Sequence, residues 1–230
     1  MATAVSNKSF VDQVIKEIVA PAADQLMANR FFTDLRAGTL TTRRLQGFSL
    51  QHTWFNRSLL KSGALRMIKA SSDNDAFMSA VRGIVGEFTH PDMCKKFGLS
   101  LGLTEEDFAT ELPIYEVLLH TSVIAAAPLI VGNNAAGRTS GMTNEFIVQR
   151  YATEMADYLA KPPYNMSKDA LQFFIVHGVV DVEHSREAAE DVVRLASSDL
   201  DLELVRYTAK NMVKLKLAKF EGIYDHYAGA

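Results

Sequence analysis

The sequence predicts an all-α fold, a compact bundle of about seven or eight helices. Apolar residues recur at spacings of three and four along almost the whole chain, as in Phe10, Val14 and Ile18, and this is the period of a helix. The alternation of apolar and polar residues that indicates strands is hard to find. With 230 residues, 48% of them hydrophobic, and no long linker, we expect one helical domain over residues 1–230.

Turn-forming residues set the expected ends of the helices in order. The first helical stretch ends near Gly38, and the later ones end at clusters of Gly, Pro, Ser and Asn. Two breaks also carry start signals: Thr104 and Asp107 form a variant of the capping box, and Ser167 stands at an N-cap position. The breaks are expected at residues 37–39, 71–74, 102–104, 132–141, 161–164 and 197–199.

The charge balance and the single cysteine exclude several classes of function. The chain carries 24 Lys and Arg against 27 Asp and Glu, well mixed, so no basic field favours nucleic acid or an anionic membrane. Cys94 is the only cysteine, which rules out an internal disulfide and a multi-cysteine metal site and suits a reducing cytosol. The N-terminal residues are too polar for a signal peptide, and the most apolar run, residues 123–131, is too short to span a bilayer. We expect a soluble, cytoplasmic protein.

Three segments that lie far apart in the sequence carry the ligand types of a metal site. With about 3.6 residues per turn, His177, Asp181 and His184 lie within about 60° of one another around a helix axis. Glu87 and His90 stand at positions i and i+3, which also face the same way on a helix. The candidate ligands are three carboxylates and three imidazoles: Glu87, His90, Glu145, His177, Asp181 and His184.

The chemistry of these ligands favours iron or manganese. Burying imidazoles and a carboxylate without partners would cost on the order of several kcal/mol, so a partner is expected. Three carboxylates offset most of the charge of two divalent ions, and imidazoles complete a mixed nitrogen and oxygen shell suited to iron or manganese. Zinc is the rival, but a hydrolytic zinc site needs only about three protein ligands. A single histidine is more often a hydrogen-bonded core residue than a ligand, so the prediction depends on the whole set.

The pattern resembles that of the haem-oxygenase-like diiron oxidases and oxygenases. The shared elements are Glu87-x-x-His90-Pro, a Gly-Leu-Thr break after it, and a lone Glu upstream of His-x-x-x-Asp-x-x-His. That family includes CADD-type proteins that help make para-aminobenzoate, fatty-acid decarboxylases that form terminal alkenes, and certain N-oxygenases. The resemblance covers residues 87–184. It implies a haem-oxygenase-like bundle in which the six candidates bind two non-haem irons, the second of them weakly held.

The chain departs from CADD-type proteins at two positions. Some of them take their first carboxylate two turns before the histidine, where this chain has Gly83, so Glu87 serves as in the alkene-forming branch. A lysine that takes part in their self-consuming reaction corresponds by spacing to Met155, which argues against a role in para-aminobenzoate synthesis. The small residues before Glu145 leave its register open, with Glu154 as the substitute.

The resemblance implies an enzyme that uses O₂ and an external reductant to oxidise a small organic substrate, such as an amino acid, an aromatic amine or a fatty acid. One alternative is a cofactor-free or hydrolytic enzyme of cofactor metabolism, similar to TenA-type or PqqC-type proteins. TenA-type chemistry uses a cysteine nucleophile, and only Cys94 is present. The other alternative is a non-catalytic interaction protein. A homodimer is the default assembly, because most soluble oligomers are symmetric pairs.

Overall fold

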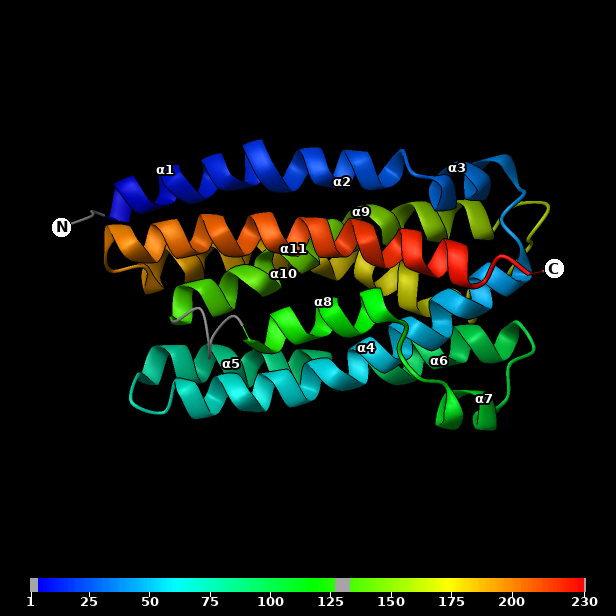
Figure 1. The fold of residues 1–230 in the computed structure, drawn as a ribbon, viewed down its shortest axis with the longest axis horizontal. Coiled ribbons are helices and arrows are strands. Elements are labelled where there is room, and N and C mark those ends of the chain that lie inside the picture. Colours follow the sequence, from blue (N-terminus) through cyan, green and yellow to red (C-terminus); the bar gives the residue numbers. More distant parts are fainter. Residues whose placement is uncertain (1–3, 127–132, 230) are drawn as a thin grey trace.

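The computed structural model describes residues 4–126 and 133–229, and within these ranges every regular element is a helix. The helices run roughly along one long axis, with the two termini at opposite ends of the molecule (Figure 1). The predicted all-α fold is confirmed. Among the helices so described, none offers an apolar stretch that could span a bilayer. In chain order the elements are α1 (Ala4–Val14), the π-helical turn η1 (Ile15–Val19), α2 (Ala20–Met27), α3 (Arg30–Ala37), α4 (Thr42–Lys69), α5 (Asn74–Glu87), α6 (His90–Ser100), α7 (Glu105–Thr110), α8 (Tyr115–Ala126), α9 (Asn134–Leu159), α10 (Gln172–Leu195) and α11 (Asp199–His226).

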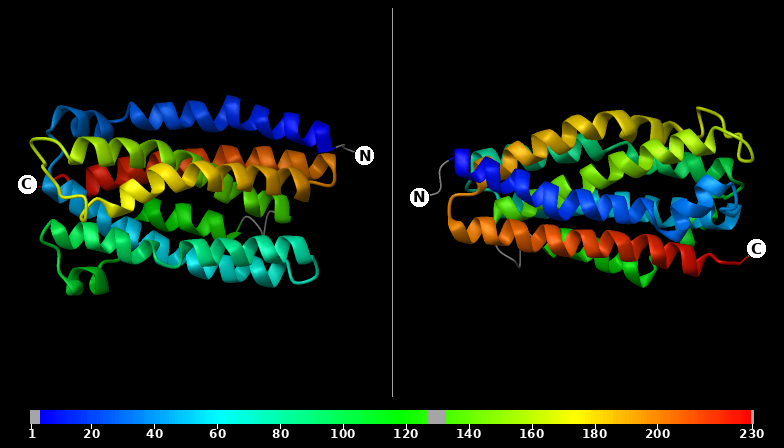
Figure 2. Two further views of the ribbon diagram at one scale, coloured as in Figure 1. Left: turned by 180° about the vertical axis from the view of Figure 1, so that it is seen from behind. Right: turned by 90° about the horizontal axis from the view of Figure 1, so that it is seen from above.

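The helices are stacked in three layers. In the view of Figure 1, α1 and α2 lie along the top, α9, α10 and α11 form the middle, and α4, α5, α6 and α8 lie below; Figure 2 shows the same order from behind. Within the bundle α9 packs most extensively against α10, and α6 contacts both α4 and α10. The candidate metal ligands belong to α5, α6, α9 and α10, so the site lies where the middle layer meets the lower one.

Several predicted helix ends are confirmed. Gly38 ends α3 in the left-handed conformation, with a φ of 71°, which glycine adopts without a steric penalty. Thr104 and Asp107 form a reciprocal capping box at the start of α7. Ser167 accepts a hydrogen bond from the backbone N–H three residues on (3.2 Å), but it caps only a turn, because α10 begins later, at Gln172.

The predicted break over residues 132–141 is wrong for most of its length. The helix α9 begins at Asn134, and Asn133 caps it by accepting a hydrogen bond from the backbone N–H three residues on (2.7 Å). The small residues that suggested a loop, among them Gly137, are buried on the helix, where short side chains let neighbouring helices approach closely. Residue 132, the first of the predicted break, lies outside the described residues.

Aromatic side chains fill the centre of the bundle. Phe31, Phe48 and Phe220 come from α3, α4 and α11, and their ring centroids are 5.4, 5.9 and 6.1 Å apart. Phe174 of α10 packs on Phe48 at 5.6 Å, and all four rings are fully buried. Aromatic pairs in this range add about 0.5–1.5 kcal/mol each beyond the burial of their area. This core therefore fixes α10, which carries three of the candidate ligands, against α4.

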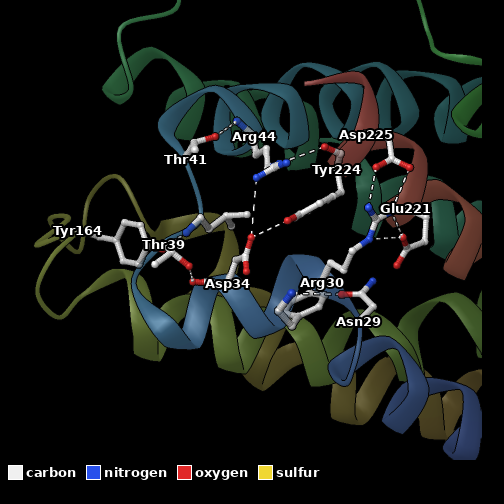
Figure 3. Close-up of polar contacts among 12 residues, drawn as sticks. Asn29, Arg30, Asp34, Thr39, Thr41, Arg44, Tyr164, Glu221, Tyr224 and Asp225 are labelled. Atoms are coloured by element: carbon white, nitrogen blue, oxygen red, sulfur yellow. Dashed lines mark hydrogen bonds and ion pairs between the residues drawn. The ribbon is translucent and has the colours of Figure 1, made fainter. Parts of the chain in front are cut away.

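A polar cluster ties α3 and α4 to the C-terminal helix α11 (Figure 3). The Arg44 guanidinium lies over the ring of Tyr224, 3.6 Å from its centroid, and donates a hydrogen bond to the carbonyl of the same residue (3.0 Å). The Tyr224 hydroxyl donates to Asp34 (2.7 Å), and Arg30 pairs with Asp225 (2.9 Å). Exposed ion pairs contribute about 1 kcal/mol or less, so the cluster orients the helix ends more than it stabilises the fold.

Gly47 allows α4 to lie directly against the ring of Tyr227. A Cβ added at Gly47 would overlap this buried ring, whose hydroxyl accepts a hydrogen bond from Gln51 Nε2 (2.8 Å) and so resists displacement. Gly47→Ala is therefore expected to lower the free energy of unfolding by about 1–3 kcal/mol in urea denaturation followed by circular dichroism. Gly86→Ala, where the added methyl meets open space, is the control and should not destabilise. Equal losses in both variants would contradict the steric explanation.

Candidate metal centre

Glu87 and His90 meet at the junction of two helices. Glu87 is the last residue of α5 and His90 is the first of α6, so the prediction that one helix carries both is wrong. Pro91 in the first turn of α6 accounts for the new helix start, because proline cannot donate the N–H that a continuing helix needs. Across the junction His90 Nδ1 lies 2.7 Å from Glu87 Oε2 in a hydrogen bond.

This contact shifts the pKa values of both partners. Burial raises the pKa of the Glu87 carboxyl, but the hydrogen bond from His90 and the neighbouring imidazoles outweigh it, and the pKa lies below its ordinary value. Burial lowers the pKa of His90, but the hydrogen bond and the charge of Glu87 outweigh that effect and hold it above the ordinary value. The contact therefore favours an ionised Glu87 carboxylate that accepts a hydrogen bond from the Nδ1 proton of His90.

His177 brings α10 to the same junction. Its Nε2 lies 3.1 Å from His90 Nδ1, and its Nδ1 lies 2.6 Å from the carbonyl oxygen of Phe173. Because a carbonyl can only accept, Nδ1 carries the proton and the Nε2 lone pair faces His90. Burial holds the pKa of His177 below its ordinary value. The ring is thus neutral and oriented, as a metal-binding histidine needs to be.

Asp181 and His184 follow on the same face of α10, as the helical period predicts. Asp181 is buried, whereas His184 is about a third exposed and lines an open cleft. The Nδ1 atom of His184 lies 3.6 Å from Asp181 Oδ1, and this contact raises the pKa of His184 above its ordinary value. The three α10 candidates therefore extend from the buried junction to the solvent.

Glu145 lies in the middle of α9 and lines the same cleft as Glu87 and His184. Its Oε2 is buried without a hydrogen-bond partner, and its Oε1 lies 3.7 Å from Arg138 Nη1. Burial raises the pKa of the Glu145 carboxyl to about 7. A buried carboxylate oxygen with no donor is unfavourable, and a cation beside it would remove the penalty.

The cleft has a volume of about 450 Å³ and lies among α5, α9 and α10. An adjoining smaller cavity of about 40 Å³ lies between α4, α5 and α9, and it shares Glu87 and Glu145 with the cleft. Glu154, the substitute that the sequence left open, pairs instead with Arg36 (2.8 Å) and lines neither space. The structure therefore places Glu145, not Glu154, with the other candidates.

The donor set fits divalent cations, but it is not preassembled as a ligand shell. Among the described residues, no three His, Cys, Asp or Glu side chains are arranged so that they could hold a metal ion as they stand. The separations from His90 Nδ1, 2.7 Å to Glu87 and 3.1 Å to His177, are nevertheless close to the ~3 Å between neighbouring ligand atoms that each lie ~2.1 Å from an ion. A cation would take over the role of the proton that Glu87 and His90 share.

Two arginines at this site escape the sequence reasoning. Arg138 stands seven residues before Glu145 on α9, about two turns, and that spacing is a signal that the two share a face. Arg138 is mostly buried, and its Nε donates a hydrogen bond to Asp191 (3.2 Å). Arg66 of α4 lines the smaller cavity with Arg138, and nothing in its local sequence marks it.

A second polar cluster, also missed, lies inside the bundle. Lys216 and Lys219 of α11 are only 1% and 0% exposed. The Nζ of Lys216 donates to Asn144 Oδ1 (2.7 Å), and that of Lys219 lies 3.0 Å from His52 Nδ1. Burial lowers the pKa of Lys216 to about 7 and that of Lys219 well below its ordinary value. The available signal is that both lysines interrupt the apolar stripe of α11.

A comparison with protein families places the chain among known proteins. Residues 64–216, which include every candidate ligand, match the family model described as iron-containing redox enzyme. The chain belongs to this family. No curated protein matches it. Membership in the iron-containing redox enzyme family agrees with the iron and redox chemistry that the sequence resemblance implies.

Several solved structures share the fold of this chain. A domain of unknown function with a heme oxygenase-like fold from Shewanella denitrificans superposes with a TM-score of 0.80 at 17% identity, over 91% of this chain and 90% of that one. A TenA homologue from Pseudomonas syringae gives 0.80 at 15% identity, over 97% and 96%. A CADD-like protein of unknown function from Nostoc punctiforme gives 0.72 at 12% identity, over 96% of each chain. The likeness shows the fold alone, and it confirms the predicted haem-oxygenase-like bundle.

Proposed function

We propose that this protein is an O₂-activating oxidase or oxygenase that holds two non-haem irons and acts on a small organic substrate. The observation that carries the proposal is the meeting of Glu87, His90 and His177, from three separate segments, with donor atoms 2.7 and 3.1 Å apart. Glu145 and His184 line the cleft together with Glu87, and Asp181 lies between His177 and His184 on α10. The proposed ligand set is Glu87, His90, Glu145, His177, Asp181 and His184.

The role of the protein residues is to hold and orient the metal ligands and to exclude water from the buried side of the site. The Phe173 carbonyl fixes the tautomer of His177, and the Phe173 ring packs on its imidazole with centroids 4.1 Å apart. Behind Phe173 the ring of Phe174 packs at 5.2 Å, and Phe97 packs on Phe174 at 4.9 Å, so aromatic rings back His177 on its buried side. When bound, a pair of ferrous ions supplies the electrons that reduce O₂. A substrate and O₂ would enter through the cleft, and an external reductant would restore the ferrous state.

The TenA-like alternative lacks a suitable nucleophile. Cys94 is fully buried, and its Sγ donates toward the carbonyl of Ser49 (3.7 Å). Burial raises the pKa of its thiol to about 12, so the thiolate that would attack a substrate is scarce at neutral pH. Cys94 lines neither the cleft nor the smaller cavity.

Anaerobic iron loading tests the proposal. The metal-free protein is expected to bind about two Fe(II) per chain, as other diiron carboxylate proteins do, and to show transient visible absorption after O₂ is admitted. Mn(II) is titrated in parallel. Glu145→Gln should lower the bound iron, whereas Glu183→Gln, which changes an exposed carboxylate of α10 paired with Arg186, should not. Iron binding no stronger than to an unrelated protein, or O₂ uptake no faster than by free Fe(II), would overturn the proposal.

A further inference from the structure

Two guanidinium groups lie beside the candidate metal ligands. Arg66 comes from α4 and Arg138 from α9, and both line the smaller cavity together with Glu87 and Glu145. Arg138 also lines the cleft, so the two spaces meet at this residue. The arginine pair therefore faces the space in which a substrate would approach the proposed irons.

The two arginines differ in what they contact. Arg138 Nε donates to Asp191 (3.2 Å), and its Nη1 lies 3.7 Å from Glu145 Oε1. The Nε of Arg66 is buried without a hydrogen-bond partner, and within the described residues the Arg66 guanidinium forms no ion pair. Burial, and after it the charge of Arg138, lowers the pKa of Arg66. A buried donor group of this kind lacks its anion.

Two glycines make room for these guanidinium groups. A Cβ added at Gly83 would lie 3.1 Å from Arg66 Nη2, and one added at Gly141 would lie 3.1 Å from Arg138 Nη1. Both glycines stand inside helices, where each is about 1 kcal/mol less favourable than alanine. The room beside each guanidinium thus comes at the expense of helix stability.

The charges around Arg66 indicate what kind of ligand would bind there, and this step rests on the proposed function. Glu87 and Glu145 are the carboxylates that act most strongly on Arg66, and both are proposed to bind iron. A carboxylate bound to a cation no longer neutralises a guanidinium, so Arg66 would then need another anion. The fork of N–H donors on arginine matches the two oxygens of a carboxylate. We propose that Arg66 and Arg138 bind the carboxylate of the substrate, which makes the substrate a compact organic acid.

The two spaces have suitable sizes. The smaller cavity, about 40 Å³, is near the ~30 Å³ that one water molecule occupies in the liquid, so it suits a small polar group such as a carboxylate. Leu59, Ile84 and Ile124 also line it and would contact the first carbon atoms of the substrate. The rest of the substrate lies in the cleft of about 450 Å³, whose lining is mostly charged. A long alkyl chain would find no apolar channel there.

Isothermal titration calorimetry with hexanoate tests the assignment on the Fe(II)-loaded protein without O₂. Hexanoate is expected to bind, and the matched probes hexanol and hexylamine are not. Arg66→Gln should weaken hexanoate binding about tenfold or more, with the bound iron unchanged. Arg66→Lys keeps the charge but loses the fork and should show a smaller loss. Gly83→Ala, which displaces Arg66 without changing it, should also weaken binding.

Arg57→Gln is the matched control. Arg57 lies on the same helix as Arg66, is exposed, and lines neither the cleft nor the smaller cavity. Its removal should change hexanoate binding by less than about twofold. Equal losses in Arg57→Gln and Arg66→Gln would mean that hexanoate responds only to the general positive charge, which overturns the assignment, as would equal binding of hexanol. If circular dichroism shows that Arg66→Gln does not fold, unchanged binding in Arg66→Lys and Gly83→Ala overturns it instead.

The assignment and the proposed function fail separately. If the protein binds no iron, but hexanoate binds the metal-free protein and Arg66→Gln abolishes this binding, the carboxylate site stands and the diiron proposal falls. If two irons bind, but hexanoate binds wild type and Arg66→Gln equally well, the metal centre stands and the substrate assignment falls.

Discussion

His177→Ala is expected to remove roughly half of the bound iron, because the Nε2 atom of His177 is the donor that α10 contributes at the Glu87–His90 junction. The Nδ1 hydrogen bond to the Phe173 carbonyl holds this donor in place, and alanine removes both the donor and the hydrogen bond. The measurement is iron per chain by plasma mass spectrometry, after anaerobic loading and gel filtration. Metal-dependent thermal stabilisation should fall in the same variant, since a ligand stabilises only the state that binds it.

His226→Ala is the control for this prediction, because His226 is exposed near the C-terminus, after the family match has ended. It should bind as much iron as wild type. If His177→Ala retains the full iron content and merely unfolds at a lower temperature, His177 is a packing residue, and the ligand set is wrong at the position on which the proposal rests. Loss of iron in both variants would indicate non-specific binding to surface histidines.

Lys216→Met is expected to stabilise the protein by about 2–4 kcal/mol at neutral pH. The Lys216 ammonium must lose most of its hydration in the folded state, and this burial lowers its pKa from 10.5 to about 7. Methionine has similar length and no charge, so it removes that penalty and gives up only the hydrogen bond to Asn144. The free energy of unfolding in urea, compared between variant and wild type, measures the gain.

The pH dependence of that gain has a definite sign. Between about pH 7 and pH 10.5 the unfolded chain keeps a proton on Lys216 that the folded chain has lost, so the stability of the wild type rises with pH in this window. The advantage of Lys216→Met should therefore be full below about pH 7 and disappear above the ordinary lysine pKa. Lys214→Met, at an exposed position of the same helix, should show no such trend. A gain that grew with pH would contradict a neutral buried lysine.

The sequence predicts those parts of the site that lie on one uninterrupted helix. His177, Asp181 and His184 share a face of α10 because no glycine or proline breaks the period strongly enough between them to change the register. The contact between Glu87 and His90 is also as predicted, although the helix that was expected to produce it is not continuous. Positions i and i+3 are close in a turn as well as in a helix. The spacing therefore predicts the contact even though the continuous helix was wrong.

The position of Arg66 in the site and the contacts of Lys216 lie beyond such reasoning. Each residue stands on a long helix whose local pattern does not state which neighbouring helix it will face, since that is decided by packing between segments distant in the chain. The start of α9 fails for a related reason: small residues that favour a loop in isolation are tolerated in a helix when a close neighbour covers them. Local secondary-structure propensity predicts poorly wherever tertiary packing stabilises a different conformation.

The junction between α5 and α6 has a mechanical consequence. Glu87 is the last residue of α5 and His90 is the first residue of α6, and only Phe88 and Thr89 connect the two helices. An ion bound by both residues and by His177 would cross-link α5, α6 and α10 at one point. It would thereby restrict the movement of α5, which forms one wall of the cleft. The width of the cleft entrance would then depend on whether the ion is bound.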